Sequence, residues 1–240
     1  MILKTLAQTY GKSEPVTMVK SLIRGSRKNS ADLVPAYPSN YLVMVSKIVA
    51  IFLDMFTCRI DDELELRMIE PHHATELNKL VRDNYDHICE WSDWLTEKER
   101  PLERTKEWIG KNLASFAAGE GYEIGIWLAG KMVGQVGYSN IAPQDRKAEI
   151  GYWLAADAQG KGVVTKACRA LISNAFDTLN IHRIEIRCGT ENHKSRRVTE
   201  RLGAQFEGTA RHAEWLHDSP IDLAVYSILE TEWESPARSD

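Results

Sequence analysis

Two glycines flank a lysine where a helix is expected to begin. Residues Asp157 to Ala167 read DAQGKGVVTKA, and apolar residues then recur at intervals of three and four positions. The first turn of a helix has unpaired N–H groups and a positive dipole end, and glycines let a diphosphate come close to that backbone. The segment therefore indicates a phosphate-binding loop. A plain turn is the alternative, because glycines are also the ordinary way to make one.

Two familiar nucleotide-binding motifs do not fit this loop. A Walker loop requires Gly-x-x-x-x-Gly-Lys-Ser/Thr, and the dinucleotide fingerprint requires Gly-x-Gly-x-x-Gly. Thr165 stands three positions after Gly162, so neither pattern is met. What remains is the physical argument for an anion at the helix N-terminus.

A second candidate is the segment ENHKS, Glu191 to Ser195, between an expected strand and an expected helix. Asn192 and Ser195 are residue types that cap helices by default. From the sequence alone, a capping role and a chemical role are equally good explanations of this pair.

The elements that must position these segments alternate between strands and helices. The hydrophobic pattern predicts strands over residues 65–69, 122–128, 131–138, 149–154, 183–188, 204–216 and 222–229, and helices after Pro71, over 99–116, after Gly162 and over 195–202. This order predicts an α/β (α+β) fold, in which helices pack on a mixed, twisted central sheet.

Residues 1–54 differ from the rest of the chain. Their apolar run, Tyr41 to Leu53, is interrupted by Lys47 and is shorter than the roughly 20 apolar residues of a membrane-spanning helix. Asp54-Met55-Phe56 does not look like a signal-peptide cleavage site. The segment is either an accessory helix or strand, or an extension upstream of a natural start at Met55. We favour the extension, which leaves residues 55–240 as the main domain.

Composition excludes several classes of function. The chain has 240 residues, 43% of them hydrophobic, and a formal net charge of −4 without a long basic run, which argues against direct nucleic-acid binding. The four cysteines form no Cys-x-x-Cys pair and there is no His-Glu-x-x-His, so neither a metal site nor a redox pair is predicted. The cysteines are typical of reduced thiols in a cytoplasmic protein, and no membrane partner is expected.

The loop in its context resembles a known family. Gln159-x-x-Gly162, entering a helix after the strand EIGYWL, resembles the Gln/Arg-x-x-Gly-x-Gly/Ala motif with which GCN5-related N-acetyltransferases (GNAT) hold the pyrophosphate of acetyl-CoA. Val164 departs from the small residue usual at the last position. Together with RIEIRCGTENHKSRRVTERLGAQFEGTAR and the terminal D-x-x-x-Y-x-x-L-x-x-E-W, the match over residues 55–233 looks like the RimJ/RimL branch, the ribosomal-protein N-terminal acetyltransferases and their relatives.

This resemblance implies acetyl-CoA as cosubstrate and helices on both faces of the sheet. It implies cofactor contacts from Gln159, Gly160, Lys161, Gly162, Val163, Val164, Asn192, Ser195 and Arg197, with Arg196 as an alternative for the 3′-phosphate. A bulge and splay near Tyr152-Trp153-Leu154 would receive the pantetheine arm, which makes Trp153 and Leu154 positional candidates. Asn192 would bond that arm, and Ser195 would protonate the leaving thiolate.

Two glutamates compete as the general base. Glu214 lies where the ribosomal-protein enzymes place a catalytic glutamate, and Glu149 lies where other branches of the superfamily keep their base. We prefer Glu214, because its flanking residues resemble the closer branch, although either can be an ordinary exposed strand residue.

The segment EWSDWL carries two tryptophans in an acidic setting. Paired aromatics usually pack in a core. Related enzymes use an aromatic residue in this region to flank the acceptor, so Trp94, with Trp91 as the alternate, is a candidate for substrate contact.

The expected function is therefore direct transfer of an acetyl group from acetyl-CoA to a primary amine in a ternary complex, and the acceptor that we favour is the N-terminal amine of a ribosomal protein or a similar protein. The alternatives are a small-molecule acetyltransferase for an antibiotic or a polyamine, and a non-catalytic CoA-binding module. A monomer and a homodimer are both compatible with the sequence.

Overall fold

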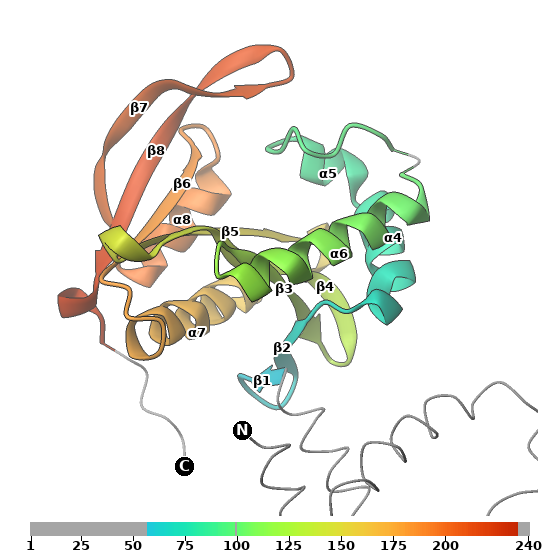
Figure 1. The fold of residues 1–240 in the computed structure, drawn as a ribbon. Helices are drawn as coiled ribbons and strands as arrows, with labels where there is room; N and C mark the ends of the chain where they lie inside the picture. The colour runs from blue at the N-terminus through green and yellow to red at the C-terminus, as the bar shows by residue number, and fades with distance from the viewer. Residues whose placement is uncertain (1–56, 99, 235–240) are drawn as a thin grey trace, which may run out of the picture. The chain divides into compact units, whose positions relative to one another are not determined.

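A computed structural model of the chain describes residues 57–98 and 100–234. The extension predicted over residues 1–54 lies outside the described residues. The strands are β1 (Thr57–Arg59), β2 (Leu64–Met68), β3 (Tyr122–Leu128), β4 (Lys131–Ala142), β5 (Lys147–Leu154), β6 (Arg183–Gly189), β7 (Gln205–Leu216) and β8 (Ser219–Leu229). The helices are α4 (Ala74–Asp83), α5 (Tyr85–Cys89), α6 (Leu102–Ala118), α7 (Val163–Asp177) and α8 (His193–Leu202) (Figure 1).

All of these strands form one mixed sheet. Their order is β1-β2-β3-β4-β5-β6-β8-β7, and within it β5 and β6 pair in parallel while the other neighbours are antiparallel. The mixed sheet predicted from the sequence is confirmed.

Helices cover both faces of the sheet, as predicted. On one face, buried residues of α7 at helical spacing, among them Ala167, Cys168, Leu171 and Ile172, pack against the apolar residues of β2 to β6. On the other face, α4 and α6 pack over Trp127 and Met132. Figure 1 shows α7 on one side of β5 and α6 on the other.

Several element ends differ from the sequence-based prediction. The helix predicted over 99–116 begins at Leu102, because Pro101 is its N-cap in an extended conformation and the residue before a proline disfavours helix. Strand β4 runs on to Ala142, past a bulge opposite Glu149 and Ile150. The short helix α5 was not predicted, since five residues give too little periodicity to detect.

Strands β5 and β6 pair over only a few residues. The register joins Lys147 with Arg183 and ends at Glu149 with Glu185. Beyond that point β5 continues along β4 while β6 continues along β8, so the two strands part. A splay was expected near residues 152–154, and the strands separate from Glu149 onward.

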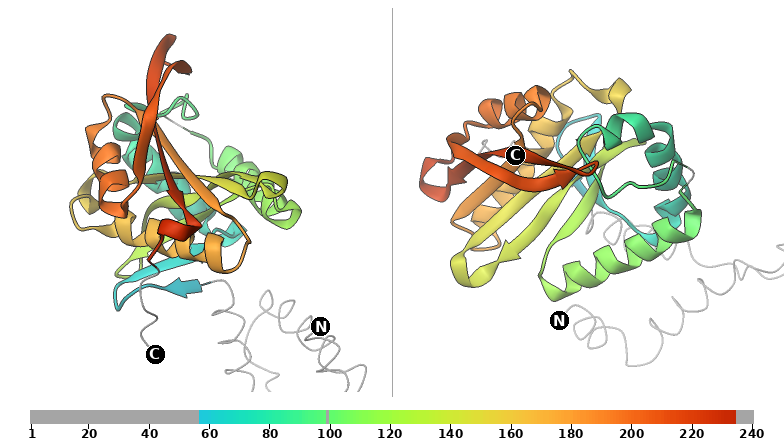
Figure 2. Two further views of the ribbon diagram at one scale, coloured as in Figure 1. Left: turned by 90° about the vertical axis from the view of Figure 1, so that its left-hand side faces the viewer. Right: turned by 90° about the horizontal axis from the view of Figure 1, so that it is seen from above.

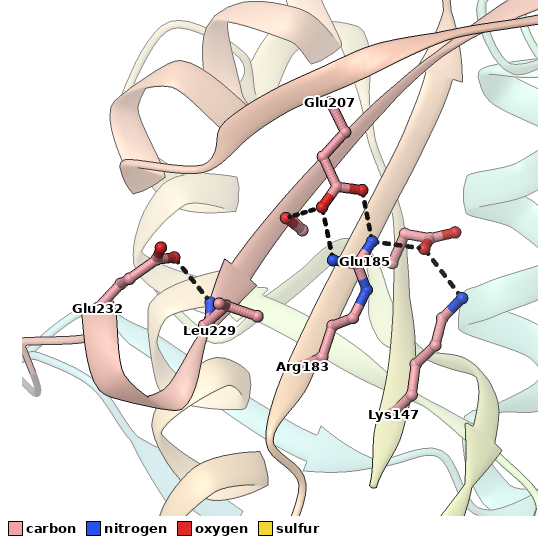
Figure 3. Close-up of polar contacts among 7 residues, drawn as sticks. Lys147, Arg183, Glu185, Glu207, Leu229 and Glu232 are labelled. Atoms are coloured by element: carbon pink, nitrogen blue, oxygen red, sulfur yellow. Dashed lines mark hydrogen bonds and ion pairs between the residues drawn. The ribbon is translucent and has the colours of Figure 1, made fainter. Parts of the chain in front are cut away.

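Charged side chains clamp the closed end of this splay (Figure 3). Arg183 donates two hydrogen bonds of 2.6 Å to the carboxylate of Glu207 and one of 3.0 Å to Glu185. Lys147 pairs with Glu185 at 2.9 Å, and Ser227 donates to Glu207 at 2.7 Å. The clamp joins β5, β6, β7 and β8 at the point from which β5 and β6 diverge.

None of the helices in residues 57–98 and 100–234 is long and apolar enough to cross a membrane.

Candidate functional site

The glycine loop leads directly into α7, as predicted. Gly160 and Gly162 have φ values of +76° and +74°, a left-handed conformation that side chains other than glycine disfavour. The first helical hydrogen bond runs from Lys166 N–H to the Gly162 carbonyl at 3.0 Å. Within the described residues, the N–H groups of residues 160–165 have no hydrogen-bond partner. The loop therefore presents a row of free donors at the positive end of a helix.

Open space lies in front of this row. A Cβ built on Gly160 or on Gly162 would meet no atom within 4 Å. A surface depression of about 670 Å³ adjoins the loop and is lined by Lys161, Val163 and Lys166 on one side and by residues 61–64 on the other. Lys166 is paired with Asp61 at 2.7 Å, which leaves the Lys161 ammonium as the other positive group of this lining.

Val164 fits the helix without closing the loop. Its partly buried side chain packs against the core beneath α7. The valine that departs from the small residue of the resembling motif is therefore accommodated by packing against this core.

Gln159 links the loop to two helices. Its Nε2 lies 2.8 Å from Nε2 of His87 on α5, and its Oε1 accepts from Lys194 of α8 at 3.2 Å. The same His87 nitrogen lies 3.2 Å from the Leu154 carbonyl. One nitrogen cannot donate and accept in the same tautomer, so it serves either Leu154 or Gln159 at a time. The sequence did not single out His87, because a lone histidine on a five-residue helix leaves no pattern.

Asn192 and Ser195 meet at the start of α8. Asn192 is the N-cap, and its Oδ1 accepts from Ser195 N–H at 3.0 Å. Asn192 Nδ2 has no partner in the described part of the chain. The capping explanation of this pair is therefore correct for the Asn192 oxygen, and the Asn192 amide nitrogen and the Ser195 hydroxyl stay available for chemistry.

The Ser195 hydroxyl has a partner across the splay. Tyr152 of β5 places its hydroxyl 2.8 Å from Ser195 Oγ and 3.3 Å from the Ser195 carbonyl. Burial holds the pKa of Tyr152 well above its usual range, so the phenol stays protonated. Sequence analysis placed the splay at Tyr152 but gave this side chain no role, because only the folded chain brings residues 152 and 195 together.

Trp153 and Leu154 are held by packing. Trp153 donates from Nε1 to Gln135 Oε1 at 2.7 Å, and Leu154 is buried. Past Glu149, the edge of β5 that faces β6 has no strand partner among the described residues. Backbone N–H groups on that edge, rather than these two side chains, are available to a ligand.

The charges of the two candidate bases, Glu149 and Glu214, influence each other. Burial raises the pKa of Glu149, Arg187 opposes that rise, and the negative charges of Glu185 and Glu214 add to it. Glu214 is exposed on β7, just after a bulge between Ala210 and Glu214. The two carboxylates are thus close enough to interact, one on β5 and one on the β7–β8 hairpin.

The two tryptophans differ in environment. Trp91 packs on β6, where a Cβ on Gly189 would meet its ring at 3.1 Å. Trp94 is 46% exposed, with the Arg100 guanidinium 6.0 Å from its ring centroid. The exposed ring of Trp94 is therefore the one available to an acceptor.

A hydrogen bond ties the hairpin to α5. His217, in the turn between β7 and β8, has its Nε2 2.6 Å from the Cys89 carbonyl. The right-hand view of Figure 2 shows β4 and β5 between this hairpin and α6. The turn of the hairpin is therefore in contact with the C-terminal end of α5.

The two arginines after Ser195 separate. Arg196 donates to the Tyr226 hydroxyl at 3.0 Å and to the Thr190 carbonyl at 3.1 Å, so it is engaged within the fold. Arg197 is exposed and has no hydrogen bond or ion pair within the described residues. Arg197 is thus the arginine that is free to meet a ligand phosphate.

No group of three or more His, Cys, Asp or Glu side chains that could hold a metal ion occurs in residues 57–98 and 100–234.

Comparisons with known proteins show the family of the chain. Residues 63–205 match the family of the acetyltransferase (GNAT) domain. The chain is 36% identical over 181 residues to the putative ribosomal N-acetyltransferase YdaF of Bacillus subtilis (strain 168), covering 75% of this chain and 98% of that protein.

Two solved structures are similar. The microcin C7 self-immunity acetyltransferase MccE, in complex with acetyl-CoA and AMP, superposes with a TM-score of 0.71 at 28% identity, covering 75% of this chain and 99% of that one. RimL, the ribosomal L7/L12 alpha-N-protein acetyltransferase in complex with coenzyme A, superposes with a TM-score of 0.69 at 26% identity, covering 72% and 97%.

Proposed function

The chain belongs to the acetyltransferase (GNAT) family, and on that premise we propose that it acetylates the α-amino group of a protein N-terminus. The observation that carries the proposal is the junction at the splay. There, free N–H groups of residues 160–165 lie at the start of α7, and the Tyr152–Ser195 pair bridges β5 and α8.

The residues present fit acetyl-CoA. The N–H groups of residues 160–165 and the Lys161 ammonium suit a pyrophosphate, because both place positive charge at a helix N-terminus with open space in front. The free edge of β5 and Asn192 Nδ2 suit the amides of the pantetheine arm, and Arg197 suits a phosphate. Acetyl-CoA supplies an acetyl group already activated as a thioester, so the chain itself needs no nucleophile.

Ser195 holds the proton needed by the leaving group. When the Tyr152 hydroxyl donates to Ser195 Oγ, the Ser195 hydrogen is available to a further acceptor, and the sulfur of Cys188 on β6 is one such neighbour. Tyr152 then stabilises negative charge that develops on Ser195 Oγ as its proton leaves. Because the phenol stays protonated, this donor is present throughout the working pH range.

A carboxylate takes the proton that the amine loses. Glu214 is exposed on the hairpin, where an acceptor enters, while Glu149 lies deeper on β5. We assign the base to Glu214, and Glu149 and Glu185 add negative charge that attracts a cationic N-terminus.

The choice of acceptor rests on the relatives. YdaF is named a putative ribosomal N-acetyltransferase, and RimL is described as acting on ribosomal L7/L12 at its alpha-amino group. The second candidate is a small molecule, favoured by the similarity to MccE, a self-immunity enzyme. A non-catalytic role is disfavoured, because Asn192, Ser195 and Tyr152 are all in place.

An acceptor screen tests this proposal. The full chain is incubated with labelled acetyl-CoA and, separately, with N-terminal peptides of ribosomal proteins, polyamines and aminoglycosides. We expect label on the α-amine of at least one peptide, located by fragmentation mass spectrometry. Transfer to small amines alone would instead assign the chain to the small-molecule class.

A further inference from the structure

Two glycines and a glutamate form one row across the sheet. Glu123 of β3 pairs with Gly137 of β4, and Gly137 pairs with Gly151 of β5. Residues directly opposite on neighbouring strands point to the same face, and so do alternate residues along one strand. The row therefore lies on the face of the sheet that carries Trp153 and the candidate base Glu149.

Room for a side chain differs along this row. A Cβ on Gly137 would meet the Tyr122 carbonyl oxygen and Glu123 Cα of the β3 backbone, and Glu123 Cγ at 3.0 Å, so β3 leaves no room for a side chain at position 137. A Cβ on Gly151 would meet nothing within 4 Å. Glu123 and Gly151 thus stand at the two ends of this row, and the open space lies beside Gly151.

The Glu123 carboxyl has no partner in the described part of the chain. Asn112 of α6 bonds only the backbone of Glu123, accepting from its N–H at 2.7 Å and donating to its C=O at 2.8 Å. Burial raises the pKa of Glu123 to about 7, and no charged side chain of the described residues contributes. A half-buried carboxyl without a donor costs stability, and such groups gather at functional sites.

The position of the row limits what can reach it. Neighbouring strands lie about 4.8 Å apart, so Glu123 on β3 starts about 10 Å from β5, where the amine to be acetylated is expected. An extended peptide advances roughly 3.3 Å per residue. A peptide whose amine lies at the splay therefore reaches the row with its third or fourth residue.

We propose that Glu123, together with the open space at Gly151, forms an acceptor subsite for a positively charged side chain at the third or fourth residue of the peptide. The inference rests on the proposed function, because it assumes a peptide acceptor. An ammonium or guanidinium supplies the donor that Glu123 lacks, and Glu149 and Glu214 add negative charge nearby.

Peptides of one sequence, differing only in Lys, Gln or Glu at residue three or four, test the subsite. Their binding to the full chain saturated with CoA is measured by calorimetry, and their acetylation is measured in parallel. We expect the Lys peptide to bind about tenfold more tightly than the Gln peptide, and the Glu peptide to bind most weakly. Glu123→Gln should remove this preference and leave CoA affinity unchanged.

Two further variants make the test specific. Glu120→Gln changes an exposed glutamate in the loop before β3 and should keep the preference for Lys. Gly151→Val should fold, since a Cβ meets no atom there and β-branched residues suit strands. This variant should bind all three peptides more weakly, because its side chain occupies the open space at position 151. Its CoA affinity and its melting temperature should stay unchanged.

Stability separates recognition from a structural role. Unfolded glutamate loses its proton near pH 4.3, whereas folded Glu123 keeps it to about pH 7. The folded state thus binds more protons between these values, and its stability falls as pH rises through them. Glu123→Gln should melt at a higher temperature than wild type at pH 8, with the difference narrowing toward pH 4. If Glu123→Gln is more stable than wild type and binds the three peptides equally, Glu123 serves recognition of the acceptor and not stability of the fold.

The outcomes distinguish this inference from the proposed function. Charge-dependent binding without acetylation supports the subsite and rejects N-terminal transfer. Acetylation with equal affinity for the three peptides in wild type rejects the subsite alone. If no peptide binds to the CoA complex, both are rejected.

Discussion

At the residue scale, Tyr152 contacts Ser195, the residue to which the family resemblance gave the proton for the leaving thiolate. Ser195→Ala removes the proton held at Oγ while leaving the Asn192 cap, because that cap bonds the backbone N–H. We expect kcat to fall by about a hundredfold, in the range for a lost general acid, with CoA affinity unchanged. Steady-state kinetics and calorimetry measure the two effects.

Tyr152→Phe is the matched variant, because it keeps the ring and removes only the hydroxyl that contacts Ser195. Its kcat should fall by a smaller factor, about tenfold, if the phenol supports the serine. Unchanged turnover in Ser195→Ala would show that solvent supplies the proton and would remove Ser195 from the mechanism.

The two candidate bases can be separated by pH profiles. A base must be ionised, so kcat/KM rises with pH through its pKa. If Glu214 is the base, Glu214→Gln abolishes the acid limb of the profile. If Glu149 is the base, Glu149→Gln abolishes it, whereas Glu214→Gln shifts it to lower pH, because it removes a charge that helps raise the pKa of Glu149. We expect the first result.

At the scale of elements, the start of α7 should decide CoA binding. Gly162→Glu places a negative side chain in front of the free N–H groups and imposes a left-handed conformation on a residue other than glycine. We expect CoA binding to become undetectable by calorimetry.

Gly203→Glu is the control for backbone strain. Gly203 caps α8 with a φ of +80°, and a Cβ there also meets no atom within 4 Å. Both substitutions should lower the melting temperature to a similar extent, and only Gly162→Glu should lose CoA. Equal loss of CoA in both variants would show that destabilisation, and not the loop, explains the effect.

At the scale of the whole molecule, the clamp of Arg183 holds four strands where the sheet divides. The hydrogen bond from Arg183, followed by that from Ser227, lowers the pKa of Glu207 to about 2. Glu207→Gln should lower the free energy of unfolding by about 1 kcal/mol at pH 7, a small value because the pair is partly exposed to solvent.

The pH dependence of this effect has a defined sign. A lowered pKa gives stability that is complete above the unfolded value near 4.3 and is lost as pH falls through about 2. The difference between wild type and Glu207→Gln should therefore be constant from pH 7 to about 5 and then shrink. Urea unfolding at several pH values measures it, with Glu120→Gln as a control that should show no difference.

The sequence by itself determined the mixed sheet, the helices that pack on it and the glycine loop, because hydrophobic period, turn residues and helix-start signals act over a few neighbouring residues. That the helices cover both faces was implied by the family resemblance. It also brought Asn192 and Ser195 forward as a pair, since both stand in one five-residue segment. The start of α6 at Leu102 and the end of β4 at Ala142 differ from the predicted positions, because a proline precedes α6 and a bulge lies in β4.

Only the tertiary structure decided which distant side chains meet. Tyr152 reaches Ser195, His87 reaches Gln159, and Glu123 lies in one row with Gly137 and Gly151. These contacts depend on strand register and on the divergence of β5 from β6, which arise from pairing between segments far apart in the chain. No local pattern encodes such pairings. The N–H donors of the loop were therefore predictable from the sequence, whereas the side-chain contacts between distant segments were not.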